Sequence, residues 1–199
     1  MVKDRAGDNL YQTTGKVDFK DRCRNLNQTG QVLWFTGLSG AGKSTIAIEL
    51  EKMLIDEGKA VYRLDGDNIR SGLNRDLGFT PEERDENIRR VAELAALFKD
   101  AGLITLVSFI SPYQEKRDFA RQRVGDDYFQ EIYVKADVET CEKRDPKGLY
   151  EQARRGEIDN FTGISAPYEE PEDPELVVDT EELSVLECAE KARKIIIEE

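Results

Sequence analysis

The sequence of 199 residues contains no histidine and only three cysteines, Cys23, Cys141 and Cys188. The cysteines are widely spaced and form no C-x-x-C pair, so the sequence predicts neither a zinc site nor a disulfide framework. We expect three reduced thiols. If Cys23 were exposed, it could pair with a second chain under oxidising conditions.

The sequence also lacks long apolar runs and an excess of positive charge. No apolar segment approaches the length that crosses a bilayer, and the polar first thirty residues do not resemble a secretory signal, so we predict a cytoplasmic protein with no membrane partner. The formal net charge of −12 disfavours broad electrostatic binding to nucleic acid. An anionic ligand must therefore be attracted by a local group of lysine and arginine side chains.

Strand and helix patterns alternate along most of the chain. Runs rich in Val, Ile, Leu or aromatic residues predict strands at 31–36, 60–65, 103–109, 129–135 and 176–179. Strands that alternate with helices indicate an α/β fold, with a five-stranded parallel sheet and helices on both faces. We predict one domain at 31–199, preceded by a flexible extension at 1–30 that could dock on it.

One motif after the first predicted strand is specific for phosphate binding. Residues 37–44 form a complete G-x-x-x-x-G-K-[ST] loop before a helix that starts near Lys43. Backbone N–H groups of such a loop and the positive end of the helix dipole bind phosphate. Lys43 is then placed to reach the β- and γ-phosphates of ATP, and Ser44 to hold Mg²⁺. The predicted ATP contacts are Gly37, Leu38, Ser39, Gly40, Ala41, Gly42, Lys43, Ser44, Thr45 and Arg144.

Carboxylates at the end of the second strand complete the predicted catalytic site. Asp65 ends this strand and Asp67 follows it, at the edge where parallel sheets bind ligands. The third strand, in contrast, lacks the terminal aspartate of a usual Walker B motif. Asp65 can hold Mg²⁺ and Asp67 can accept a proton from an attacking hydroxyl, although D-G-D alone could simply cap a turn. No N-K-x-D motif is present to bind guanine. A small-molecule phosphotransferase is therefore favoured over a GTPase.

Two further segments carry cations toward the predicted cleft. The helix that begins at Thr80 with a capping box places Arg84 and Asn87 on the same stripe as its apolar residues. Arg84 either forms a structural salt bridge or overhangs the ligand cleft, and we favour the cleft. The cationic segment 144–156 is interpreted as a mobile lid over the cleft. The alternative interpretation of this segment is a solvated surface helix. The segment 165–175 reads as an irregular connector.

The sequence resembles the adenylylsulfate (APS) kinase family in several blocks that keep the family's order. These blocks are residues 65–70, 72–79, 83–84, 87–90, 108–112, 145–150 and 161–164. The resemblance implies the P-loop kinase fold and transfer of the γ-phosphoryl group of MgATP to the 3′-hydroxyl of adenosine 5′-phosphosulfate. It also implies a homodimer. Contacts to the nucleotide-sulfate are implied for Asp67, Arg70, Phe79, Arg84, Asn87, Ile110, Ser111 and Lys147, and Phe161 is predicted to cover one adenine face.

The role of Ser111 differs between the resemblance and the chemistry of the chain. In the family this serine has been assigned as a phosphoserine intermediate and hence as catalytic. Because no histidine is present to act as its base, we favour direct in-line transfer with Ser111 hydrogen-bonded to the substrate. A kinase for another small nucleotide, a nucleotide-binding module without turnover and the kinase half of a fusion with ATP sulfurylase stay open as alternatives. The amphipathic helix expected at 185–197 favours a free-standing domain over a fusion.

Overall fold

The computed structural model describes residue 13 and residues 15–197. Five strands form one parallel sheet in the order β2-β3-β1-β4-β5. They are β1 (Gln31–Thr36), β2 (Val61–Asp65), β3 (Ile104–Ser108), β4 (Phe129–Lys135) and β5 (Leu176–Asp179). The predicted strands are confirmed, with shifts of one residue at the start of β2 and at both ends of β3.

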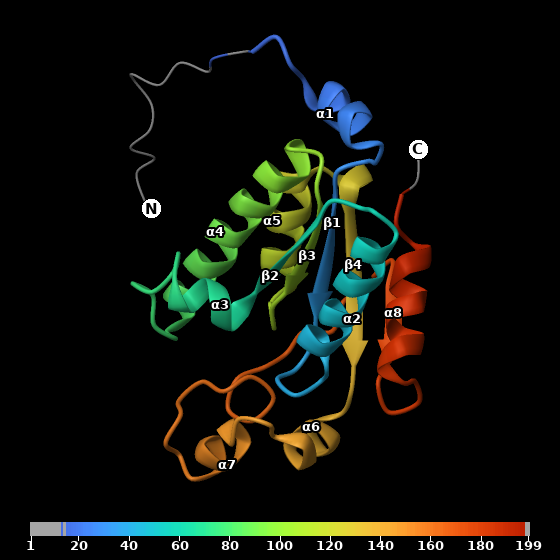
Figure 1. The fold of residues 1–199 in the computed structure, drawn as a ribbon. Helices are drawn as coiled ribbons and strands as arrows, with labels where there is room; N and C mark the ends of the chain where they lie inside the picture. Colours follow the sequence, from blue (N-terminus) through green and yellow to red (C-terminus); the bar gives the residue numbers. More distant parts are fainter. Residues whose placement is uncertain (1–12, 14, 198–199) are drawn as a thin grey trace.

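Helices cover both faces of this sheet (Figure 1). On one face α2 (Lys43–Asp56) packs against α8 (Val185–Lys194), and on the other α4 (Pro81–Asp100) packs against α5 (Gln114–Val124). The shorter helices are α1 (Phe19–Leu26), α3 (Gly66–Ser71), α6 (Val138–Arg144), α7 (Leu149–Arg154) and the 3₁₀ turn η1 (Asp126–Tyr128). The predicted three-layer α/β fold is therefore confirmed. Among the described residues, no helix has the length and apolar character that a membrane crossing needs.

The central strand β1 explains why the sheet needs both layers. Leu33 and Phe35 belong to the apolar cluster shared with α2 and α8, whereas Val32 and Trp34 belong to the cluster shared with α4 and α5. Successive side chains of a strand point to opposite faces, so a strand covered on both sides is apolar at consecutive positions. All four of these side chains are 0% exposed.

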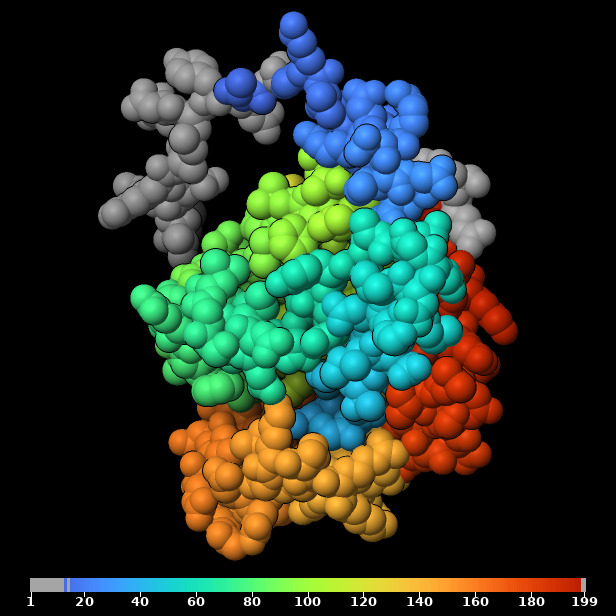
Figure 2. All heavy atoms as spheres, viewed as in Figure 1, coloured from blue at the N-terminus to red at the C-terminus, as the bar shows by residue number. Residues whose placement is uncertain are grey.

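The neighbouring strands β1 and β3 create the ligand crevice. The chain leaves β1 toward α2 on one face of the sheet and leaves β3 toward α5 on the other. Such a divergence opens a crevice at the carboxyl ends of the strands. In Figure 2 the orange segment that contains α7 lies across this end, separated by a hollow from the green segment around α3 and α4.

Helix α1 lies at the opposite end of the sheet (Figure 1). Gln28, two residues after this helix, is 3% exposed, and its Nε2 donates to the carbonyl oxygens of Ala60 and Gly102 at 2.8 Å each. Its Oε1 accepts from the N–H of Ala60 at 2.8 Å. Gln28 thus satisfies backbone groups that precede β2 and β3, which holds this part of the chain on the domain.

The sequence places residues 1–30 in an extension that could dock on the domain. In the described part of this extension, α1 and Gln28 contact the domain. The segment from α1 to the start of β1 is therefore packed against the domain and is not a loose extension. Part of the reason is polar, because Gln28 pairs with main-chain groups, a contact that low apolar content does not reveal. Packing contributes as well, since Cys23 is buried and the ring of Phe19 meets that of Tyr128 edge-on. Residues 1–12 and 14 of the predicted extension lie outside the described residues.

The three cysteines are free thiols, and all are buried. Cys23 is 6% exposed, and its Sγ accepts a hydrogen bond from the N–H of Gly30 at 3.4 Å. The exposed Cys23 that pairing with a second chain would need is therefore absent. Burial raises the pKa of Cys141 and of Cys188, which makes the reactive thiolate form scarcer.

Candidate active site

The loop between β1 and α2 is shaped to receive a phosphate group. Gly37 has a φ of 147°, and a Cβ at this position would clash with the carbonyl oxygen of Val134. Gly42 precedes α2 with a φ of 105°, and no side chain caps the first turn of this helix. The uncapped N–H groups and the positive end of the helix dipole favour an anion here.

Lys43 is held beneath this loop. The side chain is buried, and its Nζ donates to the carbonyl oxygens of Gly37 at 2.8 Å and Leu38 at 2.7 Å. Desolvation by burial is the main reason why the pKa of Lys43 falls to about 8, while the carboxylates of Asp65 and Asp67 act in the opposite direction. The ammonium is thus poorly solvated and would gain from a nearby polyphosphate.

Ser44 and Asp65, the predicted magnesium ligands, are in direct contact. Ser44 Oγ donates to Asp65 Oδ2 at 2.6 Å, and Arg63 Nη1 lies 3.5 Å from the same oxygen. Within the described residues, no group of three or more His, Cys, Asp and Glu side chains could hold a metal alone. Magnesium takes oxygen ligands and usually shares them among one or two carboxylates, phosphates and water. The hydroxyl and carboxylate oxygens found here fit such a shared site.

Ser108 is a cavity residue that the sequence reasoning did not assign. It ends β3 directly opposite Asp65 in the sheet register, where a Walker B aspartate is usual. Ser108 is 3% exposed, and its Oγ has no hydrogen-bond partner among the described residues. The signal that could have identified it is its position at the end of the strand that pairs with Asp65.

Asp67 and Lys147 form an ion pair that joins α3 to the predicted lid. Their side chains are 68% and 52% exposed, and both residues line the large cavity described below, so the contact lies at its solvent-exposed edge. A second contact anchors the lid to the phosphate loop, because the hydroxyl of Tyr150 donates to the carbonyl oxygen of Ser39 at 2.9 Å. The predicted lid therefore contacts both α3 and the phosphate loop.

Phe161 lies directly behind this lid. Its ring is 7% exposed and meets the ring of Tyr150 edge-on, with 4.9 Å between the ring centroids. Phe161 also lines the cavity described below. Burial raises the pKa of the Tyr150 phenol above its usual range, which keeps it neutral as a hydrogen-bond donor.

Two guanidinium groups line the opposite wall. Arg84 Nε donates to the carbonyl oxygen of Phe79 at 2.9 Å, and its Nη1 donates to Thr162 Oγ1 at 3.2 Å. Arg70 Nη1 donates to the carbonyl oxygen of Gly78 at 2.7 Å, and its guanidinium lies 4.4 Å from the centroid of the Phe79 ring. Burial lowers the pKa of both arginines. In the described part of the chain neither has a carboxylate partner, so the salt bridge considered for Arg84 is not formed there.

Asn87 occupies the same face of α4 one turn later. It is 3% exposed, and its Oδ1 accepts a hydrogen bond from Asn74 Nδ2 at 2.9 Å. Asn74 itself is 0% exposed and was not assigned from the sequence. The pair fixes the amide of Asn87 at the cavity wall, because each asparagine restricts the rotation of the other.

Ser111 lies in the connection between β3 and α5. It is 2% exposed and has a φ of 39°, which is unusual for a residue other than glycine. Its Oγ accepts a hydrogen bond from Trp34 Nε1 at 3.0 Å and approaches the carbonyl oxygen of Phe109 at 3.4 Å. The hydroxyl is therefore already engaged by the protein rather than free to act as a nucleophile.

One cavity of about 1040 Å³ brings most of the predicted site residues together. Its lining includes Ser39, Gly40, Gly42, Lys43, Ser44, Thr45, Asp65, Asp67, Arg70, Phe79, Arg84, Asn87, Ile110, Ser111, Lys147 and Phe161. Gly37, Leu38, Ala41 and Arg144 lie outside this lining. Arg144 instead donates to the Oγ1 and the carbonyl oxygen of Thr180, at 2.8 Å each. Besides Ser108, the lining residues that the sequence reasoning missed include Ile88 and Thr162.

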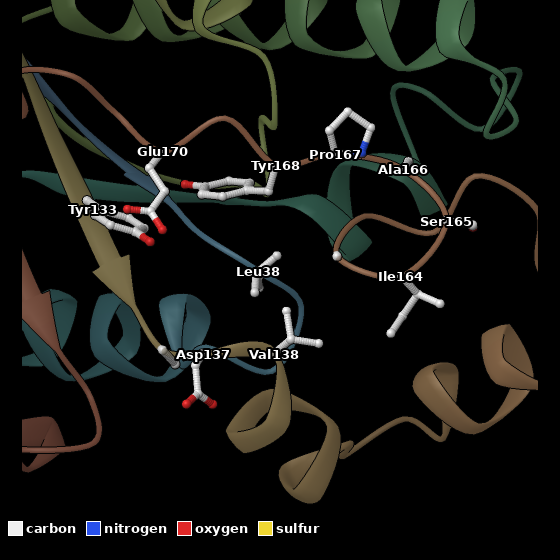
Figure 3. Close-up of a pocket in the computed structure, with 12 residues that line it drawn as sticks. Leu38, Tyr133, Asp137, Val138, Ile164, Ser165, Ala166, Pro167, Tyr168 and Glu170 are labelled. Carbon is white, nitrogen blue, oxygen red and sulfur yellow. The ribbon is translucent and has the colours of Figure 1, made fainter.

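A second cavity of about 610 Å³ lies beside the segment that follows Thr162 (Figure 3). Leu38 and Val138 point into it, and the rings of Tyr133 and Tyr168 lie along one side. Asp137 and Glu170 are its charged lining residues, and no lysine or arginine is among the residues that line it. This cavity is thus unsuited to phosphate or sulfate, whereas Lys43, Arg70 and Arg84 line the larger one.

Comparisons with known proteins agree with this geometry. The family model described as adenylylsulphate kinase matches residues 29–179. The adenylyl-sulfate kinase of Staphylococcus carnosus (strain TM300) is 56% identical over 191 residues, which cover 96% of this chain and 94% of the relative.

Two solved structures extend the comparison. The APS kinase CysC of Mycobacterium tuberculosis, in complex with AMPPNP and APS, aligns with a TM-score of 0.81 and 45% identity over 84% of this chain and 97% of that chain. A hexameric APS kinase from Thiobacillus denitrificans aligns with a TM-score of 0.64 and 32% identity over 84% of this chain and 29% of its own.

Proposed function

Because the chain belongs to the adenylylsulphate kinase family, we propose that it transfers the γ-phosphoryl group of ATP to the 3′-hydroxyl of adenosine 5′-phosphosulfate. The products are ADP and 3′-phosphoadenosine 5′-phosphosulfate, so the enzyme is a phosphotransferase with an alcohol group as acceptor. The observation that carries this function is one shared cavity. In it the phosphate loop, the carboxylates at the end of β2 and two arginines that have no carboxylate partner among the described residues meet.

The phosphate loop and Lys43 bind and activate the donor. Backbone N–H groups of residues 37–44 surround the phosphates, and the Lys43 ammonium exchanges the carbonyl oxygens of Gly37 and Leu38 for phosphate oxygens. Negative charge spreads over the phosphoryl oxygens in the transition state of phosphoryl transfer. A cation fixed in a poorly solvated site stabilises that charge more than water does.

Asp67 is the proposed acceptor for the proton of the 3′-hydroxyl. It follows the end of β2, lines the cavity and pairs with Lys147 of the lid. When the acceptor enters, Lys147 turns from Asp67 toward the anionic part of the substrate, and the carboxylate becomes available to the hydroxyl. The lid then excludes water, which would otherwise compete as phosphoryl acceptor.

We propose Mg²⁺ as the cofactor, held by Ser44 and Asp65. The support is the 2.6 Å contact between their oxygens beside the phosphate loop, which is the oxygen donor set that this ion prefers. When bound, the ion neutralises charge on the β- and γ-phosphates of ATP. Arg63 Nη1, 3.5 Å from Asp65 Oδ2, adds an ionic contact that orients this carboxylate.

The acceptor is selected by the wall opposite the phosphate loop. Arg70 and Arg84 offer planar forks to phosphate and sulfate oxygens, a geometry that matches these anions better than an ammonium group does. Phe79 is 63% exposed and carries Arg70 on one ring face, which leaves the other face for adenine. Phe161 covers the base from the lid side, while Asn87 and Ser111 supply hydrogen bonds.

A coupled assay of ADP release tests the proposed function. With saturating ATP and Mg²⁺, APS should support turnover far better than adenosine monophosphate or adenosine, because only APS presents both the phosphate and the sulfate to the two arginines. A preference for adenosine monophosphate would favour a kinase for another small nucleotide. If none of these acceptors supports ADP release, a nucleotide-binding module without turnover would be favoured.

The proposal also includes the oligomeric state of the protein and its location in the cell. The homodimer implied by the resemblance stays a prediction, as does the cytoplasmic location. A related solved structure is described as hexameric, so oligomers of several sizes have to be distinguished. Size-exclusion chromatography with light scattering gives the mass directly: a dimer of chains of 22.6 kDa each is expected, and a monomer or hexamer would contradict it.

A further inference from the structure

A buried ion pair lies directly behind the acceptor wall. Arg117 of α5 and Glu131 of β4 have side chains that are 1% and 4% exposed, and Arg117 Nε lies 2.6 Å from Glu131 Oε1. Removing two charges from water costs about as much as their attraction returns, so such a pair is weak evidence for a purely stabilising role. Its remaining contacts show what else it does.

The other two nitrogens of Arg117 hold Gln114, the first residue of α5, and Ser111, three residues before it. Nη1 donates to the carbonyl oxygen of Ser111 at 2.8 Å, and Nη2 donates to Gln114 Oε1 at 2.6 Å. Ser111 needs such support because its φ of 39° lies in the left-handed region, where a residue with a Cβ is strained. Arg117 thus uses one planar fork to connect a buried carboxylate with a strained backbone carbonyl.

The opposite side of the same connection is held from β1. Trp34 Nε1 donates to Ser111 Oγ at 3.0 Å, and Thr36 Oγ1 donates to the carbonyl oxygen of Ile110 at 2.7 Å. Thr36 Oγ1 is also hydrogen-bonded to the hydroxyl of Tyr168 at 2.9 Å. Tyr168 appears in Figure 3 as part of the wall of the second cavity. Ile110 and Ser111 are therefore fixed between β1 and α5.

This fixed connection lines the large cavity, whereas Arg117 is not among the residues that line it. We propose that Arg117, paired with Glu131, is a positioning residue for the acceptor: it holds the carbonyl of Ser111 so that Ile110 and Ser111 present the correct surface to the substrate. The identity of the acceptor as APS rests on the proposed function. The phosphate loop belongs to a different connection, so the effect of Arg117 should fall on acceptor binding and leave ATP binding unchanged.

The sharpest test is Arg117→Lys, since lysine keeps the buried charge beside Glu131 but cannot make the other two contacts of the fork. The variant should fold and melt close to the parent. Its KM for APS should rise about five- to tenfold, the scale of one lost hydrogen bond, while its KM for ATP stays within about twofold. Trp34 is the only tryptophan of the chain, so its emission reports directly on the neighbourhood of Ser111 and should shift.

Two more variants separate positioning from stability. The double variant Arg117→Met with Glu131→Met removes both buried charges together, and should show the same selective rise in KM for APS whatever its melting temperature. Arg123→Met is the matched control: Arg123 lies on the same helix and pairs with Glu93 at 2.6 Å, and among the described residues it contacts neither Glu131 nor Ser111. It should change neither KM nor the Trp34 emission.

An unchanged KM for APS and an unchanged emission spectrum in folded Arg117→Lys would overturn the proposal, as would equal increases in the KM for ATP and for APS. Failure of the proposed function is distinguishable from either result. In that case the parent itself would release no ADP with APS, while the Trp34 emission of Arg117→Lys would still show whether Arg117 positions Ser111.

Discussion

Lys43 shows how the burial of one residue is linked to ligand binding. Its pKa of about 8 lies below the value near 10.4 of an exposed lysine, because burial penalises the ammonium. A bound triphosphate restores the charged form, so ATP binding above pH 8 takes up a proton. ATP affinity is therefore full below pH 8 and falls as the pH rises from about 8 toward 10.

Calorimetry measures this proton directly. At pH 9, titrations of ATP in buffers with different ionisation enthalpies should show proton uptake in the parent and none in Lys43→Ala. The same variant should lose more than about 100-fold in kcat, because it removes a charge that stabilises the transition state. Its melting temperature should stay unchanged or rise. Equal proton uptake by parent and variant would assign the titration to another group.

Arg84 is the residue at which affinity and stability should separate. Its guanidinium is half-buried, makes hydrogen bonds only to Phe79 and Thr162 among the described residues, and has its pKa lowered by burial. Arg84→Met keeps the length of the side chain and removes the partly desolvated charge. We expect APS binding, measured by calorimetry, to weaken at least about tenfold while the melting temperature stays within about 2 °C of the parent. A strongly destabilised variant would indicate a structural role instead.

Ser111 allows the covalent and direct routes to be compared. A covalent route requires Ser111 to attack ATP first, so the enzyme with ATP alone should accumulate an acid-stable phosphoserine. The hydrogen bond from Trp34 and the burial of the hydroxyl favour a binding role instead. Ser111→Ala should then keep a measurable kcat and lose about 0.5–1.5 kcal/mol of APS affinity. Mass spectrometry after incubation with ATP decides: a stoichiometric phosphate that passes to APS would prove the direct route wrong.

Helix α4 carries Arg84 and Asn87 at the wall of the large cavity. Thr80 caps this helix, with Thr80 Oγ1 accepting from the N–H of Glu83 at 3.3 Å and Glu83 Oε2 accepting from the N–H of Thr80 at 3.1 Å. Thr80→Ala should cost about 1 kcal/mol of stability and also raise the KM for APS, because the first turn that carries Arg84 frays.

Helix α8 supplies the matched control for this prediction. Ser184 caps it through the same capping box with Glu187, and none of its residues lines the large cavity. Ser184→Ala should lower the free energy of unfolding, measured with urea, by a similar amount and leave the KM for APS unchanged. An equal loss of APS affinity in both variants would show that general destabilisation, rather than the position of Arg84, is responsible.

The strands and the long helices could be predicted because each carries a local signal. β1 is an apolar run before a phosphate loop, and α4 starts with a capping box that the structure reproduces. Helix α3 was not predicted, since its six residues carry no apolar stripe and its cap, Asp65, was assigned to the metal. Helix α1 was missed because it is held by contacts to residues distant in sequence, such as Arg22 with Asp100 and the ring of Phe19 against that of Tyr128.

The roles of some site residues could be predicted from motifs, whereas the roles of others depend on contacts that only the fold creates. The loop lysine and the carboxylates after β2 follow from motif chemistry, and the structure gathers them in one cavity. Arg117 could not be found from the sequence, because an arginine in a charged helical segment is normally solvated, and only the fold places it against Glu131 and Ser111. Ser108 was missed for a related reason: its importance depends on which strand lies beside it.

At the scale of the whole molecule, the sheet separates two ends with different tasks. The carboxyl ends of the strands carry the cavity and the lid, and the amino ends carry α1 (Figure 1). At the amino end, Arg22 pairs with Asp100 at 2.9 Å and the Lys99 ammonium lies 4.6 Å from the ring centroid of Phe19. These contacts fasten α1 far from the reacting groups, so stability and catalysis should be separable by mutation.

Gln28→Ala tests this separation. The substitution removes three hydrogen bonds and leaves the N–H of Ala60 and the carbonyl oxygen of Gly102 without their partner. An unsatisfied buried group costs about 1–3 kcal/mol, and each kcal/mol lowers the melting temperature of a domain of this size by about 2–4 °C. We therefore expect a clearly lower melting temperature, while kcat and both KM values at 25 °C stay within about twofold of the parent because the cavity end of the sheet is unchanged. A raised KM for APS in a variant that is still folded would show that the two ends of the sheet are coupled.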